Sequence, residues 1–177
     1  MAKTTLALVI PTYCRSSLLA KGIAHMADAL NSNGVTLYIS DDSPDDATET
    51  MVRTFAEQVP NIRYRRNQPA LRHDRNIVRS LLWPTEDFVW ILGDAGMVSP
   101  AGLDRVLAML DNQDLIFVNS HAPETADLPH MVGDTARKFV RDHFWHQTLT
   151  GATIYSRRML EFVRSTTPNG EGLVRNF

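Results

Sequence analysis

The chain has 177 residues, of which 44% are hydrophobic and 21% are charged, and its net charge at pH 7 is −2. This length fits a single domain with a substantial core, and the composition is ordinary for a globular protein. The nearly balanced charge does not call for a nucleic-acid partner, and no apolar run approaches the ~20 residues that span a bilayer. The lone cysteine, Cys14, excludes an internal disulfide and suits a reducing compartment, so we expect a cytoplasmic protein.

Short apolar runs alternate with segments of helical period, which is typical of βαβ units in a mostly parallel sheet. Residues 6–10 are apolar throughout and predict a strand that is buried on both faces. A helix with apolar residues between Leu18 and Leu30 follows, and Asn33-Gly34 ends it. After a second strand at 35–40, Ser43-Pro44-Asp45 predicts a helix start, because it offers a capping serine and a proline at the first helical position.

The remaining elements are predicted from the same patterns. Further strands are expected at 62–64, 88–92, 115–118 and 152–155. Further helices are expected at 73–82, 100–110, 136–147 and 158–164. Residues 121–134 are rich in Pro, Asp, Glu and Gly and predict a loop longer than usual connections, and the tail from 166 carries few signals of order.

Polar residues gather directly after the predicted strands. Pro11-Thr12-Tyr13-Cys14-Arg15 follows the first strand, Asp41-Asp42 follows the second, and Gly93-Asp94 follows the fourth. Asp74-Arg75-Asn76 lies between the third and fourth strands. The carboxyl ends of strands in an open α/β sheet form the rim at which ligands bind. The sequence therefore predicts a ligand site that is built from these segments.

Four segments, Val9 to Arg15, Ser40 to Ser43, Arg75-Asn76 and Val89 to Asp94, resemble the nucleotide-binding half of the family-2 glycosyltransferases, and most closely the abequosyltransferase-like sugar transferases. The resemblance implies the GT-A fold, a Rossmann-like α/β architecture whose mostly parallel sheet carries helices on both faces, in one domain over 1–177. Residues 5–110 would form the nucleotide-sugar-binding half and residues 111–177 a partial acceptor-side half. The implied reaction transfers a sugar from a nucleotide-diphosphate donor to a hydroxyl acceptor with inversion.

The resemblance also implies roles for individual residues. Pro11, Tyr13 and Arg15 belong to the nucleotide pocket, where the Tyr13 ring can stack on a planar base. Asp42 takes the place of a carboxylate that accepts a hydrogen bond from the base or ribose, and Arg75 that of an arginine facing the pyrophosphate. Two plainer readings stay open, because Tyr13 could be a boundary core residue and Asp42 a helix-capping acid.

The expected metal motif is incomplete. In the family, an Asp-x-Asp sequence after the fourth strand binds a divalent metal, and Mn²⁺ or Mg²⁺ suits carboxylate oxygens. Asp94 matches this motif as the metal ligand, whereas Gly96 stands where its last acid belongs. Gly96→Asp is expected to strengthen metal binding, provided that the backbone accepts a side chain. The catalytic base is expected downstream, and of Glu161 and Glu171 the sequence favours Glu171.

The expected partners are a nucleotide-sugar donor, such as a UDP-sugar, and an acceptor glycan, lipid-linked sugar, small molecule or modified DNA base. The pI near 6.3 disfavours the DNA base. Gly96 and the short C-terminus leave room for a second hypothesis, a catalytically reduced nucleotide-sugar-binding module that needs a partner or a missing C-terminal part. A sugar-phosphate nucleotidyltransferase would open with a glycine-rich loop after the first strand, and Pro11 to Arg15 contains no glycine.

Overall fold

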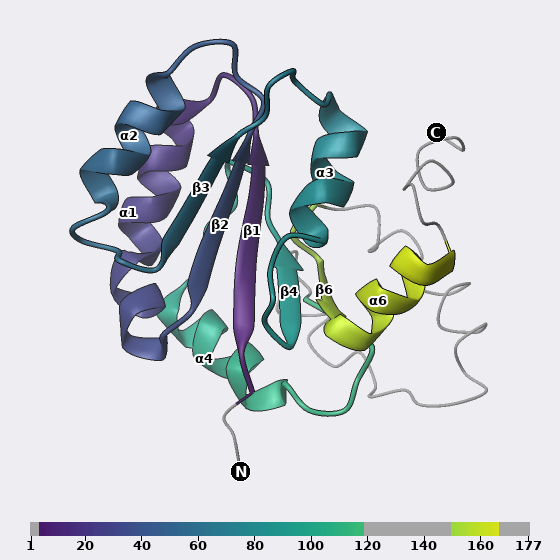
Figure 1. Cartoon of the computed structure of the whole chain (residues 1–177). Coiled ribbons are helices and arrows are strands. Elements are labelled where there is room, and N and C mark those ends of the chain that lie inside the picture. Colours follow the sequence, from purple (N-terminus) through teal and green to yellow (C-terminus); the bar gives the residue numbers. More distant parts are fainter. Residues whose placement is uncertain (1–3, 119–149, 167–177) are drawn as a thin grey trace.

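The computed structural model describes residues 4–118 and 150–166 of the chain. Within these residues, helices cover both faces of a six-stranded sheet (Figure 1). The strands are β1 (Leu6–Thr12), β2 (Thr36–Asp41), β3 (Ile62–Arg66), β4 (Phe88–Ile91), β5 (Leu115–Phe117) and β6 (Thr153–Ser156). The helices are α1 (Ser16–Asn33), α2 (Ala47–Phe55), α3 (His73–Leu81), α4 (Pro100–Met109) and α6 (Arg157–Thr166). The loop expected at 121–134, the helix expected at 136–147 and the tail from 167 lie outside the described residues.

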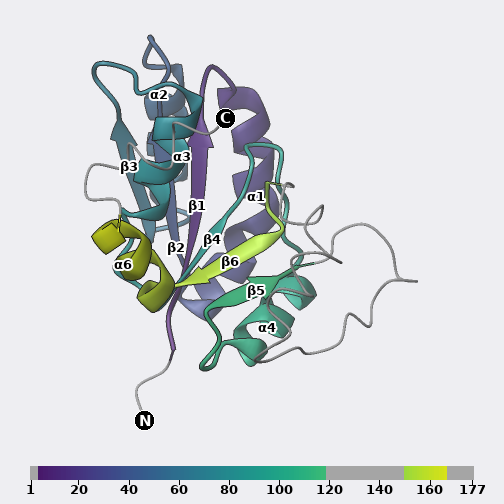
Figure 2. The same cartoon turned by 90° about the vertical axis from the view of Figure 1, so that its right-hand side faces the viewer.

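The strand order is β3-β2-β1-β4-β6-β5, and the first four strands are parallel. β6 runs antiparallel to both β4 and β5, as Figure 2 shows for β6 against β4. The chain therefore proceeds outward from β1 through β2 to β3 and then returns to place β4 on the other side of β1. Such a reversal of strand order is a topological switch point, and it opens a crevice at the carboxyl ends of β1 and β4.

β1 shows how the sheet is buried on both faces. Its side chains alternate, because successive residues of a strand point to opposite faces. Leu6, Leu8 and Ile10 join the larger hydrophobic cluster, which includes residues of α1, α2 and α4. Ala7 and Val9 join a second cluster together with residues of α3 and α6. The predicted two-sided burial of this strand is confirmed. Across the described ranges, no helix is both long enough and apolar enough to cross a membrane.

Two local signals were confirmed and one was wrong. Gly34 ends α1 with a left-handed φ of 66°, and the Ser99 hydroxyl accepts the Gly102 N–H at 3.1 Å to cap α4. The helix start expected at Ser43-Pro44-Asp45 is wrong, because α2 begins at Ala47. The Ser43 hydroxyl is engaged by Asp41 at 2.5 Å instead, so a tertiary contact takes the group that would have capped the helix.

Candidate functional site

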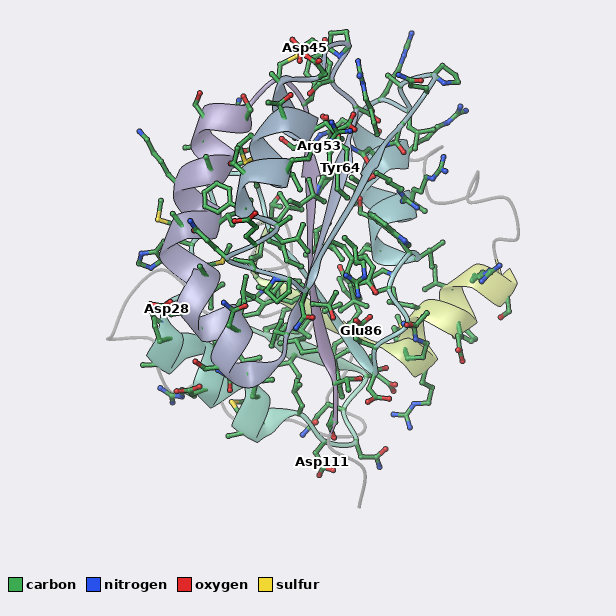
Figure 3. All side chains as sticks on the ribbon, turned by 60° about the vertical axis from the view of Figure 1, so that its left-hand side comes forward. Asp28, Asp45, Arg53, Tyr64, Glu86 and Asp111 are labelled. Carbon is green, nitrogen blue, oxygen red and sulfur yellow. The ribbon has the colours of Figure 1, made fainter. Side chains whose placement is uncertain are left out.

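The loops after the four parallel strands lie side by side in the order of the strands. They comprise residues 13–15 after β1, 42–46 after β2, 67–72 after β3 and 92–99 after β4, and we call them the carboxyl-edge site. The N–H of Asp42 donates to the carbonyl of Thr12 at 3.0 Å, which joins the first two loops. In Figure 3, Asp45 marks this end of the molecule and Asp111 the opposite end.

Asp42 ties the loop after β2 to the loop after β3. Its side chain is buried, with 4% exposure. Oδ1 accepts a hydrogen bond from Asn67 Nδ2 at 2.8 Å, and Oδ2 accepts one from the N–H of Leu71 at 3.1 Å. Each carboxylate oxygen has a second lone pair, so Asp42 keeps capacity to accept a hydrogen bond from a ligand. The alternative reading as a capping acid is wrong, because Asp46 occupies the N-cap position of α2.

Asn67 is a site residue that the sequence reasoning missed. Its Nδ2 lies within hydrogen-bond distance of Asp42 Oδ1, Ser40 Oγ and Asn76 Oδ1, and its buried Oδ1 has no partner among the described residues. Asn76 Nδ2 in turn donates to the carbonyl of Ser40 at 3.0 Å. This buried amide network fixes the rotamer of Asp42. A polar Asn in a polar loop carries no sequence signal, whereas Asn76 was visible within the Arg75-Asn76 motif.

Asp41 stabilises the site from beneath and is fully buried. Its Oδ1 accepts hydrogen bonds from the Ser43 N–H at 2.9 Å and the Ser43 hydroxyl, and its Oδ2 accepts one from the Tyr64 hydroxyl at 2.9 Å. Burial and then the hydrogen bond to Asp41 raise the pKa of Tyr64, so its hydroxyl remains a donor through the neutral range. Figure 3 shows Tyr64 below the loop that carries Asp45. Asp41 therefore organises its own loop, whereas Asp42 bonds to the neighbouring loop after β3.

Ser43 also connects this loop to the loop after β1. Its hydroxyl oxygen accepts the N–H of Cys14 at 2.8 Å. Cys14 has a φ of 54°, a left-handed conformation that non-glycine residues seldom adopt. The hydrogen bond holds this bend, and the bend sets where Tyr13 and Arg15 emerge from the end of β1. Ser43 is thus a second residue whose role the sequence did not reveal.

The expected nucleotide-binding residues are distributed along the rim. Pro11 is half-buried in β1, and Tyr13 is 60% exposed, so the reading of Tyr13 as a boundary core residue is wrong. Arg75 is exposed on the first turn of α3 and has no recorded partner within the part of the chain that the structure describes. It lines an open hollow of about 580 Å³ together with Leu71, whose N–H binds Asp42.

Asp94 and Arg15 meet across the switch point between β1 and β4. Arg15 Nε lies 3.5 Å from Asp94 Oδ2, and the Asp94 side chain is only 20% exposed. In residues 4–118 and 150–166, no group of three His, Cys, Asp or Glu side chains could hold a metal ion. Divalent cations of this class need several oxygen ligands. Asp94 offers one carboxylate that is already paired with a cation, so the described residues do not form a metal site by themselves.

The expectation for Gly96→Asp required a backbone that accepts a side chain at this position, and the structure does not meet this condition. The Gly96 N–H donates to the Gly93 carbonyl at 2.8 Å in a tight turn. A Cβ atom at Gly96 would lie 2.9 Å from that carbonyl oxygen and 3.2 Å from the Leu92 Cβ. The first distance is shorter than side chains tolerate, and a backbone atom cannot move aside cheaply. The lost acid therefore cannot be restored without distorting the turn.

We expect Gly96→Ala to lower the free energy of unfolding by about 1–3 kcal/mol, as overpacking against rigid atoms does. Gly93→Ala is the matched control, because among the described residues its Cβ would meet only the Thr150 methyl at 3.7 Å, an ordinary contact. Urea unfolding of both variants measures the difference. Equal stabilities would show that the turn accepts a side chain, and Gly96→Asp would then again be a reasonable way to rebuild a metal site.

The catalytic base is not located by the structure. Glu171 lies outside the described residues. Glu161 is exposed on α6, which follows β6. β6 ends at Ser156, opposite Phe88 at the amino end of β4. α6 therefore begins at the amino ends of the parallel strands, whereas the carboxyl-edge site lies at their carboxyl ends. This position does not favour Glu161 as a base.

Comparison with solved structures identifies the fold. A mannosyltransferase, PcManGT from Pyrobaculum calidifontis, solved with GDP-Man and Mn²⁺, superposes with a TM-score of 0.65 at 14% identity over 92% of this chain and 47% of that one. TarS residues 1–349 from S. aureus, solved with UDP-GlcNAc, superposes with a TM-score of 0.63 at 16% identity over 90% of this chain and 47% of that one. The expected GT-A fold is confirmed.

Sequence comparison gives the family. The abequosyltransferase RfbV of Salmonella typhimurium is 29% identical over 121 residues, which are 67% of this chain and 36% of that protein. The chain thus spans about a third of the curated relative and about half of each solved structure. The model of the glycosyl transferase family 2 matches residues 7–161. Because this match extends from β1 into α6 and includes every loop of the carboxyl-edge site, the chain belongs to glycosyltransferase family 2.

Proposed function

We propose that this chain binds a nucleoside-diphosphate sugar and transfers the sugar to an acceptor hydroxyl. One observation carries the proposal, the placement of the Asp42 carboxylate between two ligand-facing loops. Its N–H binds Thr12, next to the exposed Tyr13 ring, and its Oδ2 binds Leu71, which lines the same hollow as Arg75. An aromatic ring, an anchored acceptor and a guanidinium therefore come from the successive segments that follow β1, β2 and β3.

Each group suits one part of the donor. The Tyr13 ring can stack on any base, since every base has a π-face. Asp42 is acceptor-only when ionised and would accept a base N–H or a ribose hydroxyl. The planar fork of Arg75 suits phosphate oxygens. The complexes of PcManGT with GDP-Man and of TarS with UDP-GlcNAc support a sugar nucleotide as the donor class. We infer a uridine nucleotide first and a guanosine nucleotide second.

The chemical step that we propose is a single displacement. The acceptor oxygen forms a bond to the anomeric carbon while the bond from that carbon to the diphosphate breaks, which inverts the configuration. The acceptor hydroxyl proton passes to a general base, which typically contributes about 10²–10⁴-fold. Glu171 remains the predicted base. The acceptor remains a glycan, lipid-linked sugar or small molecule by prediction, with a modified DNA base disfavoured by the charge.

A divalent metal is a separable part of this proposal. Asp94 is the residue that would hold Mn²⁺ or Mg²⁺, with phosphate oxygens and waters as the other ligands. When bound, the ion would neutralise charge on the departing diphosphate. The Mn²⁺ in the PcManGT complex supports this role, whereas the single, ion-paired carboxylate does not.

We expect UDP, and more weakly GDP, to raise the thermal unfolding midpoint of the 177-residue chain. A ligand present at 100 times its dissociation constant adds about 2.7 kcal/mol to the free energy of unfolding. Inorganic pyrophosphate is the control, because it lacks the base and ribose that Tyr13 and Asp42 would bind. The absence of any shift with UDP or GDP, with or without Mn²⁺, would contradict the proposed function.

A second candidate is a catalytically reduced module that binds the donor without transferring sugar. Gly96, where the family motif has an acid, is the observation that favours it. Once UDP binding has been shown, the two candidates can be distinguished by supplying UDP-GlcNAc and following the release of UDP over hours. Slow release that falls in Asp94→Asn supports the transferase, and tight binding without release supports the reduced module.

A further inference from the structure

Arg15 has a position that the roles assigned above do not explain. It follows β1, Asp94 follows β4, and the two side chains meet across the switch point at 3.5 Å. The carboxylate is largely covered, whereas the Arg15 side chain is 60% exposed. The ion pair is formed through Nε of the guanidinium, and the Arg15 side chain forms no other hydrogen bond or ion pair with residues 4–118 and 150–166. No described residue therefore occupies its two terminal NH₂ groups.

The geometry prepares this guanidinium to bind phosphate. Asp94 approaches it at Nε, so the edge formed by the two terminal nitrogens is not blocked by any described residue. That edge presents two parallel N–H donors, which match two phosphate oxygens in a bidentate contact. The ion pair also restricts a long side chain that would otherwise lose rotamer freedom on binding. Asp94 thus acts as the residue that positions Arg15.

The same carboxylate is poorly placed to hold a divalent ion. A metal at Asp94 would lie next to the Arg15 guanidinium and would have to find its other ligands without a second protein acid in the described residues. Gly96 supplies none, and the tight turn leaves no space for one. Gly22 of α1 packs closely against this turn, since a Cβ at Gly22 would lie 3.3 Å from the Gly96 carbonyl oxygen. In this structure the cation next to Asp94 is therefore the Arg15 guanidinium.

We propose that the Arg15 guanidinium, positioned by Asp94, binds the diphosphate of the donor in place of a divalent metal, so that this site binds nucleoside diphosphates without metal. The inference rests on the proposed function, because it concerns the phosphate end of the same donor. It assigns to Asp94 the opposite role from the expected one. The carboxylate orients a resident cation and does not coordinate an exchangeable one.

The test measures the dissociation constant of UDP by calorimetry, in EDTA and in Mn²⁺, for the wild type, Arg15→Gln and Arg53→Gln. Arg53 is the matched control, because it forms a similar exposed ion pair with Glu49 on α2, away from the carboxyl-edge site. We expect wild-type constants within about threefold of each other in the two media. Arg15→Gln should weaken UDP binding in EDTA about tenfold, as loss of charged hydrogen bonds does, and Arg53→Gln should leave it unchanged.

Two further measurements keep the outcomes separate. UMP binding reports the base and ribose pocket, and Arg15→Gln should weaken it less than UDP binding. Asp94→Asn should weaken UDP binding in EDTA about threefold, because Arg15 is kept but no longer held. The inference is overturned if Mn²⁺ tightens wild-type UDP binding tenfold or more, or if Arg15→Gln binds UDP in EDTA as the wild type does. If the wild type binds neither UMP nor UDP in either medium, the proposed function fails first and the inference fails with it.

Discussion

Asp42→Ala is expected to weaken UDP binding at least tenfold and also to lower the free energy of unfolding by about 3 kcal/mol. The second effect arises because the carboxylate is buried and satisfies two donors, Asn67 Nδ2 and the Leu71 N–H. A buried donor that loses its partner costs about 1–3 kcal/mol. The proposed function therefore gives Asp42 a role in both ligand binding and the fold, and alanine at this position is expected to be neutral for neither.

The two effects of Asp42 can be separated by a second variant. Asp42→Asn keeps the shape and one acceptor oxygen, so it should cost less stability than alanine while it still removes the charge that would bind the nucleotide. Asp45→Ala is the matched control, since Asp45 is an exposed acid in the same loop whose side chain accepts, within the described part of the chain, only the Ala47 N–H. Urea unfolding and calorimetry with UDP measure both quantities. An Asp42→Asn protein with unchanged UDP affinity would remove Asp42 from the binding site.

Asp41 and Asp42 show which features of the candidate site could be predicted from the sequence and which could not. The pair was visible as two acids at the end of a strand, and the resemblance favoured Asp42 as the ligand-facing one. The structure gives them different partners, Tyr64 for Asp41 and Asn67 for Asp42, which lie 23 and 25 residues further along the chain. A local pattern cannot contain such partners, so the division of work between the two acids could not be predicted.

The strands and most helices were predictable because their signals are local. An apolar run before Pro11 predicted β1, and Ser99-Pro100 predicted the start of α4, which the Ser99 hydroxyl caps. The start of α2 was not predictable, because the Ser43 hydroxyl forms hydrogen bonds with Asp41 and with the Cys14 N–H and does not cap the helix. The crowding at Gly96 is likewise a property of the folded turn. The errors of the sequence-based prediction therefore occur where residues of the site contact one another in the folded chain.

Ser43→Ala is expected to lower the free energy of unfolding by about 1–3 kcal/mol and to weaken UDP binding as well. The variant removes a donor to the buried Asp41 and the acceptor of the Cys14 N–H. Loss of the second bond releases the bend at Cys14, so Tyr13 and Arg15 would no longer leave β1 in one fixed direction. A ligand binds with lower affinity when its binding has to order the protein side chains that contact it.

A matched serine distinguishes loss of order at the site from general loss of stability. The Ser156 hydroxyl donates to Asp114 at 3.2 Å and accepts the Met159 N–H at 3.0 Å, so it also bridges two partners in a buried position. Ser156 faces the amino end of β4, at the opposite edge of the sheet from Ser43. Ser156→Ala should therefore cost similar stability and leave UDP affinity unchanged. If both variants weaken UDP binding equally at a temperature where both are folded, the hydrogen bond from Cys14 to Ser43 does not organise the donor site.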